Sequence, residues 1–562
     1  MKVFTSLRSF LEGDAPRGRR LIIAVLLGLL FALPFSLSFL APLSFLFVAP
    51  LAARLFCLVE KGASLRWLYA EGICAFWGFH FGGFYWFIRM YPLDFVGLSP
   101  IEAILFLFAA MVILPLFLAA IWAFVPLFLR LLAPHAPKGS YPLLFPPLFG
   151  AFAVLVLYAE CHTELWIPFV RLSLTWAETP ALAQGASVFG AYFLDFLLFA
   201  LGGFLGVGCV LLLQKRGALP RRLLPIALAL CLFLSNLALS LPLYFASHEG
   251  EELRVAAIQG NTPSSTHHLR TETEMIRLYG NLTREAVEEG ATLVLWPETA
   301  VAYPIRAGSA FYTDLEDLAI ETGATLAVGA FEVEGTAAYN AIFLIPPTRF
   351  SETETYRKMH PVPFGEYVPG RDIVLALFPF MGNIAQFNSM LSPATEVLTL
   401  RSTAVSWQGE ERTTPTLGGM ICFDSIYPDV ARSGVAGGAE VLLLPTNDSW
   451  FFDSAATEMH LSHARLRAIE TGRWVVRSGH TGISCLIDEK GNVTEKIPLL
   501  TEGYAIGDVT ALTHTTVYAA VGDVFVLLCL LFALAFPAIT LGKTLGRKWQ
   551  THKKKENTEV PE

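Results

Sequence analysis

Three residues with different reactive groups end three short strings in the second half of the chain. Glu298 ends Leu-Trp-Pro-Glu and offers a carboxylate, Lys358 ends Tyr-Arg-Lys and offers an ammonium, and Cys422 ends Gly-Met-Ile-Cys and offers a thiol. A carboxylate can take the proton of a thiol, a thiolate is a strong nucleophile, and an ammonium can hold the negative charge that develops on an attacked carbonyl oxygen. Brought together, these groups could carry acyl transfer.

Two of these residues stand where a run of β-type residues ends. Glu298 follows the apolar run 292–296, where a carboxylate should have a raised pKa, which suits a general base. Cys422 ends the run 417–421 and precedes a turn, where backbone N–H groups favour a thiolate and can bind an oxyanion. The residues alone leave other interpretations open: a surface glutamate, a solvated lysine at Lys358 and a buried free cysteine.

The composition indicates a membrane protein. Of the 562 residues, 54% are hydrophobic and 16% are charged, and the mean hydropathy is +0.53. A soluble protein carries about a quarter charged residues, so much of the surface of this chain must lie in lipid. The formal net charge of −8 gives nucleic-acid binding no electrostatic support.

The cysteines indicate no metal site. The eight cysteines show no CxxC or Cys/His metal spacing and no nucleotide motif is visible, so we expect neither a metal nor another cofactor. Six of them lie in or beside apolar runs and are expected to be small buried hydrophobes. Cys422 and Cys485 lie in the more polar segment; a disulfide between them is the less favoured alternative, because the thiol of Cys422 has a chemical use.

Eight apolar runs approach or exceed the length that spans a bilayer, about 20 residues. They cover residues 21–35, 37–56, 67–87, 98–129, 141–158, 184–213, 223–245 and 517–541. The first two, separated only by the region of Pro34, could also form one broken hairpin. With eight spans the basic clusters fall on one side of the membrane, which is then the cytoplasmic side. The predicted parts are a cytoplasmic tail (1–20), seven spans (21–246), an outer domain (247–514), a last span (515–541) and a basic cytoplasmic tail (542–562).

The outer segment has ordinary soluble composition and alternates strands with helices. Strands are predicted at 254–259, 292–296, 325–331, 340–345, 417–421, 441–444, 474–478 and 482–487, and helices at 267–289, 309–322 and 455–471. Such alternation predicts an α/β layered domain. The expected fold class is a polytopic α-helical membrane protein of about eight spans, with an α/β domain inserted before the last span.

Several strings of the outer segment stand in an order typical of one family. Besides the three reactive strings these are Pro-Phe-Gly-Glu-Tyr-Val-Pro at 363–369, Pro-Thr-Asn-Asp-Ser-Trp-Phe at 445–451 and His-Ala-Arg-Leu-Arg-Ala-Ile-Glu-Thr-Gly at 463–472. From about 253 to 510 the chain resembles the nitrilase (carbon-nitrogen hydrolase) superfamily. With the spans around this segment, it resembles the apolipoprotein N-acyltransferases in particular. The resemblance implies a nitrilase-like αββα sandwich.

The resemblance also implies roles for the site residues. Glu298 would be the general base, Cys422 the nucleophile, and Lys358 would hold the oxyanion together with a backbone N–H near Phe423. Glu366 would orient Lys358. Further residues are implied in supporting or substrate-binding roles: Phe423, Asp424, Asn447 and Trp450.

The implied reaction is a two-step acyl transfer. The thiolate would take an acyl chain from a phospholipid as a thioester, and the α-amine of the N-terminal S-diacylglyceryl-cysteine of an apolipoprotein would then attack that thioester. The implied setting is the inner membrane of the cell, with a monomeric enzyme whose catalytic domain lies on the periplasmic side. Because both substrates are anchored in one leaflet, the bilayer is itself a partner and the thiol must lie close to its surface.

Some features of this chain bear on substrate contacts. The apolar stretch 373–381 could be a lid that dips into lipid, or a segment packed on the domain itself. The family commonly has Cys-Tyr-Glu where this chain has Cys-Phe-Asp at 422–424. It often has a tryptophan soon after Gln-Gly-Asn, where this chain has two histidines at 267–268. Substrate contacts in that region are therefore expected to differ.

Other functions remain compatible with the residues. A membrane-tethered amidase or nitrilase would use the same reactive groups with water as the acceptor, but it would need only one anchor. A transporter with an accessory outer domain is a different class. The acidic residues Glu71 and Asp195 within spans are functional candidates by default, although hydrogen bonding between helices explains them as well. No clear repeat of spans supports transport, and the three reactive groups argue against an inactive lipid-binding module.

Overall fold

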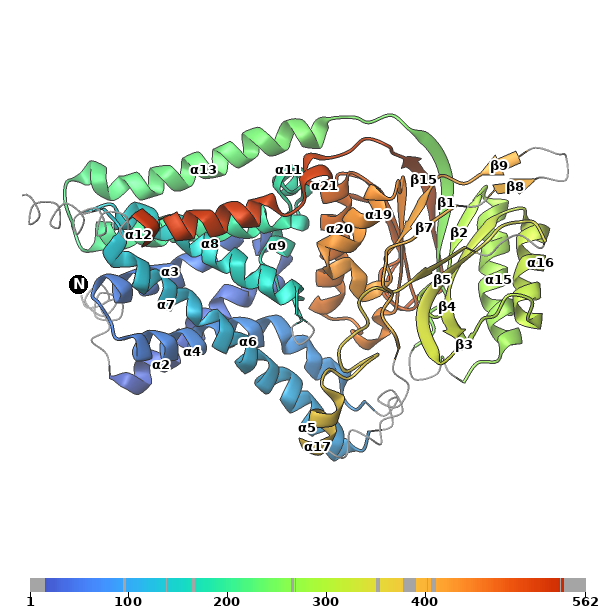
Figure 1. Cartoon of the computed structure of the whole chain (residues 1–562), viewed down its shortest axis with the longest axis horizontal. Coiled ribbons are helices and arrows are strands. Elements are labelled where there is room, and N and C mark those ends of the chain that lie inside the picture. Colours follow the sequence, from blue (N-terminus) through green and yellow to red (C-terminus); the bar gives the residue numbers. More distant parts are fainter. Residues whose placement is uncertain are drawn as a thin grey trace, which may run out of the picture.

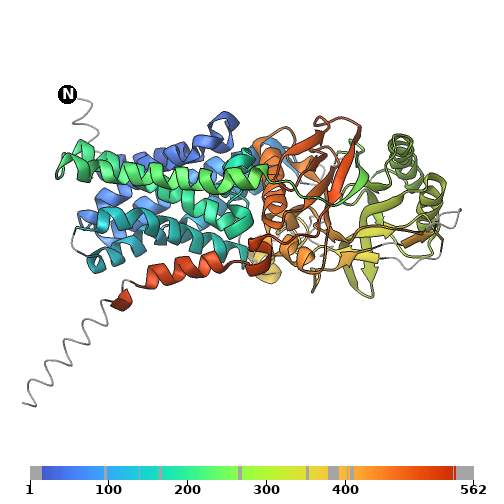
Figure 2. The same cartoon turned by 90° about the horizontal axis from the view of Figure 1, so that it is seen from above.

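The computed structural model describes residues 16–93, 98–137, 139–163, 167–263, 267, 269–349, 354–377, 391–401, 403–405, 411–535 and 537–539. A helical bundle forms one end of the molecule and an α/β domain forms the other, in both views (Figures 1 and 2). Helix α13 (Leu219–Phe245) runs along the edge of the bundle, and the chain then passes into the α/β domain as strand β1 (Glu251–Gln259).

The helices of the bundle fall on the apolar runs that the sequence marks as spans. Among the residues that the structure describes, six helical stretches are long and apolar enough to cross a membrane: Arg17–Phe35, Ser38–Glu60, Pro100–His135, Tyr141–Cys161, Ala191–Leu213 and Leu219–Phe245. The predicted third span is the 20-residue helix α4 (Leu65–Phe84), and the last is a shorter apolar helix, Val524–Ile539. The helices of these stretches are α2 (Arg17–Ala32), α3 (Ser44–Glu60), α5 (Pro100–Phe108), the π-helix η5 (Ala109–Ile113), α6 (Leu114–Trp122), α7 (Phe124–Leu132), α8 (Tyr141–Cys161), α12 (Ala191–Leu213) and α13.

Two predicted spans are broken by glycines. The run 184–213 contains α11 (Ala186–Phe189), a break at Gly190 with φ of 79°, and then α12. A Cβ on Gly190 would lie 2.5 Å from the ring of Tyr518, so the chain approaches too closely for a side chain there. The run 517–541 contains α21 (Val517–Val521), which ends at Gly522 with φ of 67°. Residues 540–562, including the predicted basic tail, lie outside the described residues.

The two acidic residues that the sequence marks within spans, Glu71 and Asp195, pair with arginines from other segments. Glu71 on α4 contacts Arg54 on α3 at 2.8 Å and also pairs with Arg20 on α2. Asp195 on α12 accepts from Arg171 at 2.8 Å. Each pair satisfies buried charges that would otherwise be costly in lipid. For Glu71 the structure shows hydrogen bonding between helices, whereas Asp195 joins α12 to the segment just before α9 (Ser173–Ala177).

The α/β domain has two stacked sheets, as the nitrilase-like prediction requires. The first has the order β15-β1-β2-β4-β5-β6, with β3 paired to β4, and the second has the order β14-β13-β12-β11-β10-β7. Their bounds are β2 Leu293–Leu295, β3 Val301–Pro304, β4 Thr325–Glu334, β5 Ala337–Ile345, β6 Glu354–Arg357, β7 Thr399–Leu400, β10 Leu417–Gly419, β11 Val441–Thr446, β12 Trp474–Gly479, β13 Cys485–Ile487, β14 Val493–Lys496 and β15 Gly503–Ala511. A small hairpin, β8 (Thr403–Val405) and β9 (Glu411–Thr413), stands apart.

Side-chain alternation along the strands fills both faces of each sheet. In β1, Val255 and Ala257 belong to the core between the sheets, whereas Ala256 and Ile258 belong to the core under α15 (Glu272–Glu288) and α16 (Ala310–Thr322). Helices α19 (Pro428–Ala436) and α20 (Ala455–Thr471) cover the second sheet. The layers are therefore helices, sheet, sheet and helices.

The eight predicted strands and three predicted helices of this domain are all present, with shifted ends. Within the predicted helix 267–289, helix α15 begins at Glu272, where Thr271 forms a capping box with Glu274. Strands β6, β14 and β15 were not predicted, because their charged or glycine-containing sequences lack a clear apolar alternation. Strands β3, β7, β8 and β9 were not predicted either, because they are only two to four residues long. Strand β15 nevertheless pairs with the whole of β1 in antiparallel register, from Glu251 with Ala511 to Gln259 with Gly503.

Helix α20 joins the α/β domain to the bundle. His463 on α20 donates through Nε2 to the carbonyl oxygen of Phe169 at 3.0 Å. Glu470, two turns further along, accepts from the backbone N–H of Ala191 at 2.6 Å, at the first turn of α12. Figures 1 and 2 show α20 at the end of the domain that faces the bundle. The same helix packs against the turn that begins at Cys422.

Candidate active site

Cys422 begins a sharp turn at the end of a buried strand. Strand β10 ends at Gly419, and the 3-10 helix η8 (Cys422–Ile426) starts at Cys422 itself. The φ angle of Cys422 is 49°, in the left-handed region that residues other than glycine rarely adopt. Such backbone strain persists only where the surrounding structure enforces it, and it is commonest at functional sites. The predicted strand-to-turn position of the thiol is confirmed.

Glu298, Lys358 and Cys422 come together in a buried site. The Nζ atom of Lys358 lies 2.8 Å from Oε1 of Glu298, and the same carboxylate interacts with the thiol of Cys422. Lys358 follows β6 at the edge of the first sheet, and Glu298 follows β2 of that sheet. Cys422 comes from the second sheet, so the site forms where the ends of the two sheets meet.

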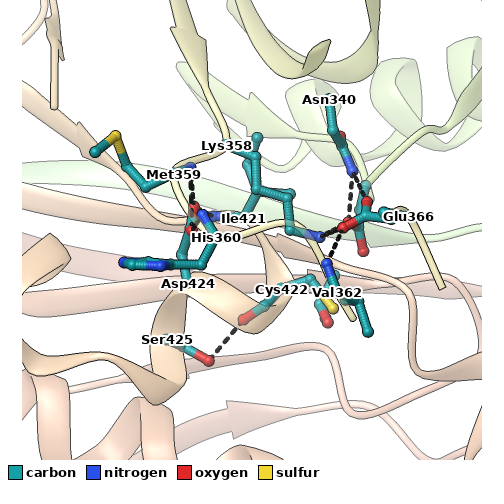
Figure 3. A network of polar contacts seen from close by, with 12 residues as sticks. Asn340, Lys358, Met359, His360, Val362, Glu366, Ile421, Cys422, Asp424 and Ser425 are labelled. Atoms are coloured by element: carbon teal, nitrogen blue, oxygen red, sulfur yellow. Dashed lines mark hydrogen bonds and ion pairs between the residues drawn. The ribbon is translucent and has the colours of Figure 1, made fainter. Parts of the chain in front are cut away.

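Glu366 and Asn340 complete the set of groups around the ammonium. Lys358 Nζ lies 2.8 Å from Oε2 of Glu366, and the backbone N–H of Val362 donates to that same oxygen at 2.7 Å. Asn340 donates from Nδ2 to Glu298 at 2.7 Å and to Glu366 at 2.9 Å (Figure 3). The ammonium is therefore held between two carboxylates that one amide ties together.

Asn340 was missed at the level of sequence. It lies on β5 in the string Tyr-Asn-Ala-Ile, and it is a lone amide in an otherwise apolar buried run. A buried amide needs hydrogen-bond partners, so its place in this strand was the available signal. Its partners, Glu298 and Glu366, lie 42 and 26 residues away along the chain, so the local sequence around Asn340 could not predict them.

Burial and charge set the protonation of the three reactive groups. Burial raises the pKa of Glu298 above its ordinary value, although the ammonium of Lys358 opposes this, as predicted for a general base. Burial alone would lower the pKa of Lys358, but the carboxylates of Glu298 and Glu366 outweigh it and hold that pKa well above its usual range. The lysine is therefore a permanent cation.

The thiol of Cys422 is not poised as a free thiolate. Burial raises its pKa well above the ordinary value, and the negative charge of Glu298 adds to the effect, while Lys358 acts in the opposite direction. The expectation that the turn favours a thiolate is wrong for this site as it stands. The thiol therefore needs a base in direct contact, and Glu298 occupies that place.

Asp424 fastens the turn of Cys422 to the segment that carries Lys358. Its carboxylate accepts from the backbone N–H of Ile421 at 3.0 Å, from the hydroxyl of Tyr356 at 2.9 Å and from the backbone N–H of His360 at 2.8 Å (Figure 3). The shorter aspartate thus reaches donors on both sides of the site. Its partners are backbone groups and a tyrosine, which is a scaffolding arrangement.

The other predicted residues lie near the turn in different surroundings. Asn447 accepts through Oδ1 from the backbone N–H of Ser449 and so caps the short helix η9 (Asp448–Trp450), while the side chain of Trp450 is half-buried. Phe423 is buried beside Cys422. Cys485 is a free buried cysteine of β13, and Cys422 is free as well. The substrate contacts assigned to Asn447 and Trp450 stay predictions.

The apolar stretch 373–381 falls partly on helix α17 (Arg371–Leu377), where Ile373 is 69% exposed. Residues 378–390 lie outside the described residues, and so does His268. His267 is buried, and its Nε2 donates at 2.7 Å to the carbonyl oxygen of Thr299, the residue after Glu298. In the described ranges, no group of three or more histidine, cysteine or acidic side chains is arranged to hold a metal ion.

Both parts of the chain, the helical part and the α/β domain, match known protein families. A family model described as carbon-nitrogen hydrolase matches residues 254–517, and one described as apolipoprotein N-acyltransferase N-terminal domain matches residues 27–204. The solved structure of Nit3 from Saccharomyces cerevisiae, a member of branch 10 of the nitrilase superfamily, is 18% identical, with a TM-score of 0.34, and covers 47% of this chain and 93% of that chain.

Curated relatives align across both parts. The apolipoprotein N-acyltransferase of Geobacter metallireducens is 29% identical over 406 residues, which cover 71% of this chain and 73% of that protein. The apolipoprotein N-acyltransferase of Azotobacter vinelandii is 31% identical over 382 residues, which cover 66% of this chain and 68% of that protein. A helical membrane part and a nitrilase-like domain, matched in the same order, lead to one assignment: the chain belongs to the apolipoprotein N-acyltransferase family.

Proposed function

We propose that this membrane protein N-acylates lipoproteins by moving an acyl chain from a phospholipid, through a thioester on Cys422, to the N-terminal amine of a diacylglyceryl-modified lipoprotein. The observation that carries the proposal is the contact of one carboxylate, Glu298, with both the thiol of Cys422 and the ammonium of Lys358 in a buried site. Membership in the acyltransferase family supports the class of reaction.

In the first half-reaction Glu298 takes the proton from the thiol of Cys422. The thiolate attacks the ester carbonyl carbon of the phospholipid, and the carbonyl oxygen becomes an oxyanion. Lys358 Nζ and the backbone N–H of Phe423 hold that charge. The tetrahedral intermediate collapses, the C–O bond of the ester breaks, and Glu298 returns the proton to the leaving lysophospholipid. Cys422 is left as a thioester.

In the second half-reaction the neutral α-amine of the lipoprotein attacks the thioester carbonyl. Glu298 takes the proton that the amine loses as the C–N bond forms, and the same donors hold the oxyanion. The C–S bond then breaks, and the thiolate of Cys422 regains the proton from Glu298. The products are an amide on the lipoprotein and the free enzyme. Glu366 and Asn340 keep the ammonium and the base in place throughout.

The membrane part gives this chemistry its setting. In the described part of the chain, six helices long and apolar enough to span a bilayer precede the catalytic domain, and α20 packs that domain directly on the bundle. Two lipid-anchored substrates reach a thiol held near the membrane without leaving their leaflet. We propose the inner membrane as the location, with the catalytic domain on its periplasmic side, because the basic clusters lie on the opposite side.

Intact-protein mass spectrometry tests the proposal. Purified protein in detergent is given phospholipid alone, since the first half-reaction needs no amine. We expect a gain of the mass of one acyl chain, which hydroxylamine or a diacylated lipopeptide then removes. The Cys422→Ala protein should gain nothing.

The matched control is Cys485→Ala, which removes the other cysteine of the outer domain and should acylate like the parent. Acylation that persists in Cys422→Ala, or that maps to Cys485, overturns the mechanism. An amidase or nitrilase that uses water would instead hydrolyse small amides and add no acyl chain to the lipopeptide, so the same protein preparation separates the two enzyme classes.

A further inference from the structure

The carbonyl oxygen of Cys422 is held by two side chains that the mechanism does not use. The hydroxyl of Ser425 donates to this oxygen at 2.7 Å, and Nε2 of His460 lies 3.1 Å from it (Figure 3 draws the serine bond). Nε2 of His460 also lies 3.1 Å from the serine oxygen. Because a carbonyl oxygen only accepts, the imidazole donates to it from Nε2.

Asp448 and Arg477 hold His460 in place on the side away from the carbonyl of Cys422. Its Nδ1 lies 2.7 Å from Oδ1 of Asp448, and Oδ2 of Asp448 accepts from Arg477 at 2.5 Å. Thr446 donates to Oδ1 of Asp448 at 3.0 Å. All of these side chains are buried. Although burial acts against it, the positive charge of Arg477 and the contact with His460 hold the pKa of Asp448 well below its ordinary value, so Asp448 stays a carboxylate. Because a carboxylate only accepts, Nδ1 of His460 donates to it, and both ring nitrogens therefore act as donors, Nδ1 to Asp448 and Nε2 to the carbonyl of Cys422.

The position of a carbonyl oxygen determines where the next N–H points. The carbonyl of Cys422 and the N–H of Phe423 belong to one planar trans peptide unit and point in opposite directions. Fixing the oxygen therefore fixes the direction of the N–H. Because φ of Cys422 is 49°, the unit is held in a strained conformation that would relax without external contacts.

We propose that His460 is a positioning residue for the acyl transfer. Held by Asp448 and Arg477, it donates to the carbonyl oxygen of Cys422 and thereby keeps the N–H of Phe423 directed at the place where the oxyanion forms. The inference rests on the proposed function, in which that N–H is an oxyanion donor. Helix α20 carries His460, and it also carries His463, which contacts the bundle at Phe169. One helix thus connects the N–H of Phe423, the oxyanion donor, to the membrane part.

Two substitutions separate this role from a purely structural one. In His460→Gln the amide nitrogen reaches about as far as Nε2 and can donate to the carbonyl of Cys422. In His460→Asn the shorter amide reaches as far as Nδ1, so it keeps the contact with Asp448 and loses the carbonyl. We expect His460→Asn to slow acylation of Cys422 by phospholipid about 100-fold, the scale of losing one oxyanion donor. His460→Gln should lose much less.

A second measurement on the same proteins is alkylation of Cys422 by iodoacetamide. Alkylation displaces iodide at a saturated carbon and forms no oxyanion, so it needs the base but not the N–H of Phe423. We expect both variants to alkylate at the rate of the parent. A collapsed or unfolded site would lose alkylation and acylation together.

The positioning role is supported if His460→Asn acylates slowly but alkylates normally, and if His460→Gln loses less of the acylation rate. The positioning role is overturned if both variants lose acylation rate equally, or if His460→Asn acylates faster than His460→Gln. It is also overturned if the alkylation rate falls in step with the acylation rate, because the histidine then only supports the fold. A parent protein that phospholipid does not acylate at Cys422 overturns the proposed function itself, and this inference with it.

Discussion

The backbone N–H of His360 donates to the carboxylate of Asp424 at 2.8 Å, across 64 residues of chain. His360 follows Lys358 by two residues, and Asp424 follows Cys422 by two residues. The contact therefore joins the segment that carries the ammonium to the turn that carries the thiol. Since Asp424 also accepts from Ile421 on the other side, one buried carboxylate sets the spacing of the two reactive groups.

Replacing Asp424 by asparagine should loosen this junction. The carboxylate oxygens of Asp424 face only donors, and an amide would place its own N–H groups against some of them. A hydrogen bond to a charged group contributes about 1.5–3 kcal/mol, so we expect a lower Tm and clearly slower acylation in Asp424→Asn. The comparison variant Tyr356→Phe removes one of the donors to Asp424 but keeps the carboxylate and its backbone donors, so it should lose less than Asp424→Asn. Parental rates in Asp424→Asn would show that the junction does not matter.

Lys358→Ala and Glu298→Ala should each abolish transfer without unfolding the domain. Loss of one oxyanion donor costs about two to three orders of magnitude in rate, and Lys358→Ala also removes the partner of two buried carboxylates. The Glu298→Ala protein should acylate far more slowly, because the raised pKa of Cys422 leaves the thiol protonated without a base. A lipopeptide assay with circular dichroism as the folding control checks both. Near-normal activity in either variant means that its assigned role is wrong.

Asn340→Leu should impair catalysis without touching a reactive atom. The amide of Asn340 donates to both Glu298 and Glu366, and these are bonds to charged groups. Their worth of about 1.5–3 kcal/mol corresponds to roughly 10- to 100-fold in rate. Asn340→Asp has the same size but adds a third carboxylate, and it should be at least as slow. If Asn340→Asp instead acylates like the parent, the amide is not needed as a donor.

The rate of thioester formation should fall on the acid side as Glu298 becomes protonated. Only the carboxylate form accepts a proton, and burial raises its pKa, so the loss should begin above the ordinary value of 4.5. The negative charge of Glu366 contributes to the raised pKa of Glu298. In Glu366→Gln the acid limb of the residual rate should therefore move to lower pH. Burst rates of acylation across the pH range give both curves; a shift to higher pH contradicts the assignment.

Topology follows from the placement of the basic clusters. A reporter enzyme that is active only outside the cytoplasm should be active when fused after Ala246, at the end of α13, and inactive when fused after Lys543. The two fusions control for each other because they share the same chain and membrane. Activity of the second fusion with silence of the first would reverse the predicted orientation and remove the proposed substrates from reach of the site.

Local sequence determined the membrane class, the α/β domain and the three reactive residues. An apolar run about as long as a bilayer is thick predicts a span wherever it occurs in the chain. Strands such as β1 and β4 are recognised from the residue types within a few positions. The strings that end in Glu298, Lys358 and Cys422 are equally local, so their family could be named before any contact was known.

Only the tertiary structure decided how those residues act. Lys358 and Glu298 are 60 residues apart, and the partners of Asn340 and His460 lie in distant turns and short helices, so no local pattern contains them. The same holds for the thiol of Cys422. The turn suggested a stabilised thiolate, yet burial among distant segments raises its pKa. Local dipoles can be read from a string, whereas desolvation and pairing depend on which segments the fold brings together.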